Sequence, residues 1–329
     1  MNPTLSEAGL DALALVREEL DQVEAALRDG ATAGSAAVDA IGRHLQQSGG
    51  KRVRAAMVLL TGRLTGCPAP TRIRLAAIVE MIHAATLIHD DVIDEAPTRR
   101  GQPSANARWG NQRSVLAGDW LYMQSFRLAL EERHFGVLDA LISLTQAMVE
   151  GELLQLEMQG RVVAPAEHLD LMERKTARLF AVGAQLAPLA AGRPEAECQR
   201  LERFGRHLGL AFQMVDDLLD FTASEAVLGK PVGGDLREGK MTLPAIYAYQ
   251  AAPAADRRRF EQVLEDRGYV SVPWPAVQSL VQASGALERA RRESRAQADL
   301  ALAAMLEFPP SPWRDALARL PELVVARSH

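Results

Sequence analysis

Cysteine and long apolar runs are scarce in this chain of 329 residues, and its 37 basic residues are outnumbered by 42 acidic ones. With only Cys67 and Cys198 available, no disulfide framework is possible, and two thiols fit a reducing compartment. A net charge of −5 argues against a nucleic-acid partner. The longest apolar stretch, residues 180–192, is interrupted by Gln185 and Pro188 and is too short to span a bilayer. The N-terminal region is acidic where a signal peptide would be basic, so we expect a cytoplasmic protein without a transmembrane segment.

Apolar residues recur at helical spacing along almost the whole chain. The pattern predicts helices over residues 13–27, 35–47, 52–64, 71–94, 113–132, 137–159, 166–191 and 194–220, and a C-terminal set from 242 to 325. Neither an alternating strand nor an Asn-Gly hairpin is evident. Short breaks between helices are typical of antiparallel bundles. We therefore predict an all-α fold: a single domain, residues 1–329, in which antiparallel helices surround a central cavity.

Two copies of the pattern Asp-Asp-x-x-Asp end long apolar runs. The aspartates are Asp90, Asp91 and Asp94 in the first copy and Asp216, Asp217 and Asp220 in the second. On a helix, the first and last aspartates of each copy lie one turn apart, so their carboxylates point to one place. Carboxylates suit Mg²⁺, which usually shares its shell with substrate phosphates. One copy could be a solvated helix end, but two predict motifs that face each other across a cavity and hold a diphosphate through metal ions.

Basic residues in glycine-containing stretches supply the counter-charge that such a ligand needs. They are Lys51, Arg52 and Arg54 at a helix start, Arg99 and Arg100 after the first motif, and Lys230 and Lys240 after the second. Each stretch alone could be a solvated loop, but the repeated order favours one polyanion site. The long irregular segments 95–111 and 221–239 follow the two motifs and are candidate lids.

Three further polar residues could be either structural or functional. His83 stands two turns before Asp90, and a lone histidine in an apolar helix is often an ordinary core residue. Its alignment with the aspartates favours a place in the site. Lys175 and Thr176 could be exposed, or could point inward and meet the reacting end of a substrate.

These residues together resemble the trans-type isoprenyl diphosphate synthases, or polyprenyl synthetases, and among them the bacterial octaprenyl diphosphate synthases. The resemblance extends from about Leu13 to the C-terminus. It rests on Gly49-Gly50-Lys51-Arg52-x-Arg54, the segment from Glu80 to Asp94, Arg99-Arg100-Gly101, Gly118-Asp119-Trp120-Leu121, the segment from Lys175 to Phe180, the segment from Phe212 to Asp220, and the segment from Gly229 to Pro244. One departure is Ala55, where the family usually has proline.

The resemblance implies the isoprenoid synthase fold, a homodimer, and Mg²⁺-dependent head-to-tail condensation of isopentenyl diphosphate onto an allylic diphosphate such as farnesyl diphosphate. The diphosphate of isopentenyl diphosphate is expected at Lys51, Arg54, His83 and Arg100. The allylic diphosphate is expected at Arg99, Lys175, Thr176, Gln213, Lys230 and Lys240, of which the last five are also the expected catalytic residues. The six motif aspartates would hold Mg²⁺, three ions with substrate bound.

Chain length should depend on residues N-terminal to Asp90, along the predicted tunnel. Ala85 and Thr86 precede Asp90 by five and four positions, an offset of roughly 7 Å, and neither is the aromatic floor expected of short-chain relatives. Tyr122, Met123 and Phe126 are candidates for a deeper floor. These residues predict a long, octaprenyl-type product, which would supply a quinone side chain. A shorter farnesyl or geranylgeranyl product is the alternative.

Other functions compete with this interpretation. Glu80-x-x-His83 and Glu131-x-x-His134 match the ligand pattern of di-iron carboxylate bundles, but this leaves both aspartate motifs unexplained. A terpene cyclase would share the first motif but would not need Lys51, Arg54 and His83 for a second substrate. A non-catalytic partner subunit would typically have lost one motif, and both are intact in this chain.

Overall fold

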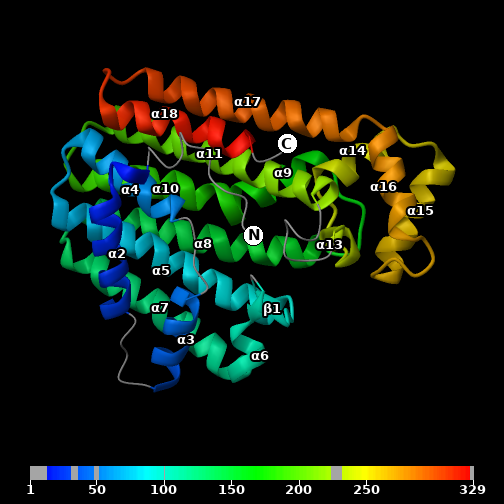
Figure 1. Cartoon of the computed structure of the whole chain (residues 1–329), viewed down its shortest axis with the longest axis horizontal. Coiled ribbons are helices and arrows are strands. Elements are labelled where there is room, and N and C mark those ends of the chain that lie inside the picture. Colours follow the sequence, from blue (N-terminus) through cyan, green and yellow to red (C-terminus); the bar gives the residue numbers. More distant parts are fainter. Residues whose placement is uncertain (1–12, 31–35, 48–51, 100, 224–231, 327–329) are drawn as a thin grey trace.

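The computed structural model describes residues 13–30, 36–47, 52–99, 101–223 and 232–326, and its described part is almost entirely helical (Figure 1). The helices before the first acidic motif and around the loop after it are α2 (Arg17–Gly30), α3 (Ala36–Gln47), α4 (Val53–Thr65), α5 (Ala69–Ile93) and α6 (Ala105–Trp109). The middle of the chain forms α7 (Asn111–Glu131), α8 (Phe135–Met158), α9 (Pro165–Met172), the π-helix η1 (Glu173–Ala177), α10 (Arg178–Ala190) and α11 (Glu195–Thr222). The rest forms α13 (Gly234–Arg237), α14 (Leu243–Ala251), α15 (Ala254–Asp266), α16 (Trp274–Ala283), α17 (Ala286–Leu306) and α18 (Pro312–Val325).

The predicted all-α fold is confirmed, and most predicted helix boundaries lie within a few residues of those observed. The prediction of no strands is wrong in one place. Within the loop after the first motif, β1 (Thr98–Arg99) pairs antiparallel with β2 (Gln102–Pro103). Strands of two residues are too short to show alternation, and the turn lacks the Asn-Gly signal, so the sequence pattern could not reveal this hairpin.

The two helices that carry the acidic motifs, α5 and α11, both pack against α10. A proline-containing first turn starts α5, and the helix is buried on all sides from Leu75 to Ile82. On its other sides α11 packs against α17 and η1. Figure 1 shows α5, α8, α11 and α17 running along the longest axis, with α7 beside α5. The acidic ends of α5 and α11 are therefore held by one shared core.

Small residues bring three elements unusually close beside the second motif. A Cβ on Gly205 would lie 2.3 Å from the carbonyl oxygen of Phe180, and one on Gly209 would lie 2.6 Å from the Cα of Ala177. Gly205, Gly209, Gln213 and Asp217 are four residues apart and form one ridge of α11 that faces α10 and η1. On the other side of η1, a Cβ on Gly151 of α8 would lie 3.1 Å from the backbone nitrogen of Lys175.

The π-helix η1 interrupts what the sequence predicted as one regular helix over residues 166–191. It contains Lys175 and Thr176, and α9 and α10 continue it on either side. The wider turn of a π-helix changes the direction of the side chains it carries, and such turns are frequent at functional sites. In this fold η1 packs against both α8 and α11, so the change lies between these two helices.

None of the helices in these described segments is both long and apolar enough to cross a membrane. Cys67 and Cys198 are free and buried. Burial raises the pKa of Cys67 to about 11 and also raises that of Cys198, so both stay protonated at neutral pH.

Candidate functional site

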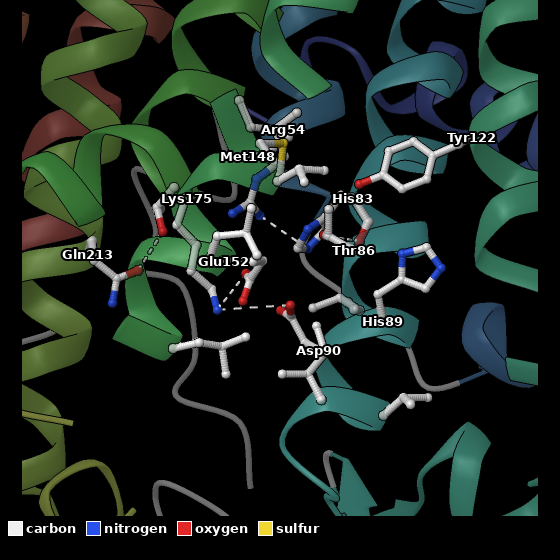
Figure 2. Close-up of a pocket in the computed structure, with 18 of the residues that line it drawn as sticks. Arg54, His83, Thr86, His89, Asp90, Tyr122, Met148, Glu152, Lys175 and Gln213 are labelled. Atoms are coloured by element: carbon white, nitrogen blue, oxygen red, sulfur yellow. Dashed lines mark hydrogen bonds and ion pairs between the residues drawn. The ribbon is translucent and has the colours of Figure 1, made fainter. Parts of the chain in front are cut away.

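A cavity of about 600 Å³ lies between the ends of α5 and α11 (Figure 2). Its polar lining consists of Arg54, His83, Thr86, His89, Asp90, Asp119, Tyr122, Glu152, Lys175, Thr176, Gln213 and Asp216. In Figure 2, His83, Thr86 and Asp90 of α5 lie on one side and Gln213 of α11 on the other, with Glu152 and Lys175 between them. The structure thus brings residues of both acidic motifs to one cavity, as the sequence predicted.

The aspartates of the first motif sit in the last turn of α5, where the negative end of the helix dipole disfavours them. Cations offset this. Lys240 Nζ donates to Asp94 Oδ1 at 2.9 Å, and Lys175 Nζ lies 3.9 Å from Asp90 Oδ1. Asp91 is 1% exposed and pairs with Arg99 at 2.7 Å. Burial raises the pKa of Asp91 above its ordinary value, although the neighbouring charge of Arg99 opposes this shift. Asp90 therefore lines the cavity, whereas Asp91 faces away into protein.

In the second motif, only Asp216 lines the large cavity. Asp217 is 1% exposed, and its carboxylate accepts from Gln213 Nε2 at 3.0 Å and lies 2.7 Å from His168 Nε2. Asp220 is fully buried and accepts hydrogen bonds from the backbone N–H groups of Gly234 and Asp235, both at 3.2 Å. Asp220 thus fixes a neighbouring segment, and Asp217 is tied to α9 and lines a smaller adjoining cavity rather than the large one.

Lys240 connects the segment that follows α13 to the first acidic motif. Its ammonium reaches Asp94 on α5 from the segment that follows α13, and it also contacts Glu238 at 3.0 Å. Burial alone would lower the pKa of Lys240, but the two carboxylates raise it above its ordinary value. A permanently charged lysine at this point can exchange its carboxylate partner for a phosphate.

Glu152 on α8 is the main cavity residue that sequence analysis missed. Its Oε1 lies 2.6 Å from Lys175 Nζ, which also donates to Gln155 Oε1 at 3.1 Å. Burial, then the neighbouring charge of Asp90, raises the pKa of Glu152 to about 7 despite the attraction of Lys175. One signal was available: Glu152 follows Gly151, and a glycine within a helix often marks a close approach.

Arg54 and His83 lie together as predicted, with Arg54 Nη1 3.4 Å from His83 Nε2. The Arg54 guanidinium also stacks on Phe180 at 4.5 Å from the ring centroid, which holds it in the cavity wall. Lys51, Arg100 and Lys230 were predicted to contribute to the same site, but they lie outside the described residues.

The structure places only some of the predicted chain-length residues at the cavity. Thr86 lines the cavity. Ala85 does not, because the cavity face of α5 carries residues 83, 86, 87 and 90, and Ala85 packs with the buried side chains of α7 instead. Met123 is 63% exposed and Phe126 packs against the main core, so neither forms a cavity floor. Tyr122, next to Met123, occupies the cavity wall.

The residues present fit Mg²⁺ only in combination with a ligand. Within the described ranges, no three His, Cys, Asp or Glu side chains gather closely enough to form a metal site on their own. Asp90 and Asp216, however, present hard carboxylate oxygens to the same cavity. Mg²⁺ bound through one or two carboxylates normally completes its shell with water and substrate phosphates, so this donor set suits a metal that arrives with a diphosphate.

The di-iron pattern is not assembled. Glu80 accepts from Arg52 and from the backbone N–H of Ala55, both at 3.1 Å. His134 caps the start of α8, where its Nδ1 accepts from Val137 N at 3.2 Å. The two Glu-x-x-His pairs therefore serve separate structural contacts.

Comparisons with known proteins agree with this geometry. The polyprenyl synthetase family profile matches residues 35–272. The octaprenyl diphosphate synthase of Escherichia coli is 35% identical over 95% of this chain and 97% of its own length. The all-trans-nonaprenyl-diphosphate synthase (geranyl-diphosphate specific) of Rhodobacter capsulatus is 37% identical over 96% of this chain and 97% of its own. A polyprenyl synthase structure from Caulobacter crescentus, complexed with calcium and isoprenyl diphosphate, superposes with a TM-score of 0.93 at 34% identity, covering 99% of this chain and 100% of that one.

Proposed function

Since this chain belongs to the polyprenyl synthetase family, we propose that it is a long-chain all-trans prenyltransferase of the octaprenyl type. It would add isopentenyl diphosphate units head-to-tail to an allylic diphosphate such as farnesyl diphosphate. The observation that carries the proposal is that Asp90 and Asp216 line one cavity together with Lys175 and Thr176.

The reaction requires the allylic diphosphate to leave. Lys175, Lys240 and Arg99 already neutralise carboxylates around the cavity and can turn to the phosphates of a substrate. Mg²⁺, three ions in this proposal, would be held by the motif aspartates and the phosphates and would supply the positive charge that lets the carbon–oxygen bond ionise.

The carbocation then needs the negative ends of dipoles close by, and an alkene placed to attack it. Thr176 and Gln213 present neutral oxygen atoms at the cavity wall that can stabilise the cation as dipoles. Arg54 and His83 would hold the diphosphate of isopentenyl diphosphate, so that its alkene attacks the cation. A proton then leaves to the released pyrophosphate, as the family resemblance implies. The segment 95–111 would help to exclude water, whereas the second predicted lid, 221–239, lies in part outside the described residues.

A long product is supported by what stands next to Asp90. Thr86 is small, and the surrounding side chains Leu87, Met148, Val149 and Leu153 are apolar. The lining thus offers a hydrocarbon chain a path past α5 toward α7 and α8. A farnesyl or geranylgeranyl product remains the alternative.

A homodimer is the second part of the proposal. Exposed apolar residues recur every seven positions on two helices: Leu116, Met123 and Leu130 on α7, and Ile142, Val149 and Leu156 on α8. Stripes of this spacing suit packing against another pair of helices, and a second copy supplies such a pair. Sedimentation should give a dimer, and Leu116→Lys, at a 66% exposed position outside the cavity lining, should shift it toward monomer; a monomeric wild type would refute this part.

The same proposal treats residues 1–329 as one domain, because Val16 near one end and Val325 near the other share the main core cluster. The cytoplasmic location predicted from the sequence stays a prediction.

The test is incubation of the purified chain with isopentenyl diphosphate, farnesyl diphosphate and Mg²⁺, followed by mass analysis of the dephosphorylated products. We expect a series of prenyl alcohols that ends near eight isoprene units. A cyclic hydrocarbon formed without consumption of isopentenyl diphosphate would indicate a terpene cyclase. An absence of turnover by the chain alone would indicate a partner subunit.

A further inference from the structure

His168 on α9 is a buried polar residue that neither the acidic motifs nor the basic stretches predicted. It is 5% exposed, and its Nε2 lies 2.7 Å from Asp217 Oδ2. Because an ionised carboxylate only accepts, Nε2 carries the proton and donates it. His168 also lines a smaller cavity of about 150 Å³, which shares Lys175, Thr176 and Gln213 with the large one.

The hydrogen bond of His168 is the outer end of a chain that reaches the cavity wall. The other oxygen of Asp217 accepts from Gln213 Nε2 at 3.0 Å, and Gln213 Oε1 accepts from Thr176 Oγ1 at 2.8 Å. An ionised Asp217 can only accept, so it sets the direction of the bond from Gln213, and the hydrogen bond from His168 holds the carboxylate in the position where it does so. With the amide N–H of Gln213 facing the carboxylate, its carbonyl must face Thr176, and a flipped amide would place its carbonyl oxygen against Asp217.

The consequence falls on the Thr176 hydroxyl. Its proton is committed to Gln213, so its oxygen lone pairs are the part that remains for the cavity. Lone pairs stabilise a developing positive charge, whereas an exposed hydroxyl proton would oppose it. Orienting this dipole before the reaction avoids a reorganisation cost at the moment of ionisation.

We infer that His168 is a positioning residue for prenyl transfer: through Asp217 and Gln213 it turns the Thr176 hydroxyl so that its lone pairs face the reacting end of the allylic substrate. This inference rests on the proposed function. The alternative is a purely structural role, in which the His168–Asp217 pair only ties α9 to α11. That role would affect stability but would not set the direction of a dipole in the cavity.

The experiment compares variants with and without a donor at position 168. His168→Leu removes the donor, and His168→Met does so with an unbranched side chain that adapts to irregular cores. His168→Gln keeps a donor. The matched control is His207→Leu, since His207 also lies on a helix–helix contact, 2.7 Å from Gln297 Oε1, and takes no part in the cavity lining. For each variant, kcat, both KM values and the thermal unfolding midpoint are measured.

We expect His168→Leu and His168→Met to lower kcat roughly tenfold to a hundredfold, the range seen when outer partners of functional groups are lost. The KM for isopentenyl diphosphate should stay within about twofold, because Arg54 and His83 lie outside the chain of hydrogen bonds. His168→Gln should recover most of kcat, and the control should lose stability with kcat unchanged. Added to Thr176→Val, His168→Leu should cause no further loss, since both act on one dipole.

Several outcomes would overturn the inference. They are an unchanged kcat in the donor-free variants, a His168→Gln variant as slow as His168→Leu, an equal loss of kcat in His207→Leu, or losses that multiply in the double variant. A wild-type chain that does not elongate farnesyl diphosphate would instead refute the proposed function itself.

Discussion

At the end of α5 and at the end of α11, the first aspartate of each motif lines the large cavity, but the third aspartates differ: Asp94 pairs with Lys240, whereas Asp220 is fully buried and accepts from backbone N–H groups. The middle aspartates also differ: Asp91 pairs with the guanidinium of Arg99, while Asp217 is bound by His168 and Gln213. One sequence pattern therefore gives two motifs that agree in the place of their first aspartate and differ in the contacts of the other two. The partners on neighbouring elements decide which role each carboxylate takes.

The strongest test of this comparison is to remove the first aspartate of each motif, because in both motifs this residue lines the cavity. Asp90→Ala and Asp216→Ala should each lower kcat by about a thousandfold or more, equivalent to about 4 kcal/mol of barrier, and should raise the Mg²⁺ concentration needed for half-maximal rate. Glu150→Ala, an exposed carboxylate on α8, is the control. Either variant turning over at the wild-type rate would remove that motif from the metal site.

Substitution of the middle aspartate should lower kcat by different amounts in the two motifs. Asp217→Asn frees the amide of Gln213 to flip, so we expect kcat to fall roughly ten- to a hundredfold. Asp91→Asn keeps an acceptor for Arg99 and should cost less than tenfold. Steady-state kinetics on both variants would check the order, and a larger loss in Asp91→Asn would mean that the two middle aspartates have the opposite roles.

The positions one turn before the motifs differ in size: Thr86 precedes Asp90, and Phe212 precedes Asp216, and both line the cavity. Thr86→Phe would make the two sides alike and narrow the path for the growing chain. Chromatography of the products should show a shift toward about the farnesyl to geranylgeranyl class. Met123→Phe, on the exposed face of α7, should leave the product length unchanged. Unaltered products from Thr86→Phe would exclude this path.

The smallest effect concerns Glu152, which lies between the two motif helices. Its folded-state pKa of about 7 exceeds the ordinary glutamate value of 4.5, so the folded state binds more protons and stability falls as pH rises through that interval. The free energy of unfolding of Glu152→Gln should therefore exceed that of the wild type by about 3 kcal/mol at most at pH 8, and the difference should disappear near pH 4.5. Urea unfolding in the presence of a chelator measures the difference, and a gain that does not grow with pH would contradict it.

Sequence periodicity was sufficient to predict the helices and the pairing of the motifs, because both depend on local spacing. It could not predict which aspartates face the cavity. Asp217 turns toward Gln213 and His168 because Gly205 and Gly209 press its ridge of α11 onto η1 and α10, and such contacts join residues distant in the chain. The misplacement of Ala85 has a similar origin: the spacing to Asp90 was correct, but only packing against α7 determines which face of α5 borders open space.

The π-helix at Glu173–Ala177 has one more consequence. Its extra residue sets the rotation of the preceding helix relative to α10. Removing any single residue from it would convert the stretch to a regular α-helix and rotate everything on its N-terminal side by about 100° relative to α10. Lys175 or Thr176 would then leave the wall they share, so a substitution at Glu173 or Arg174 should be tolerated far more readily than a one-residue deletion.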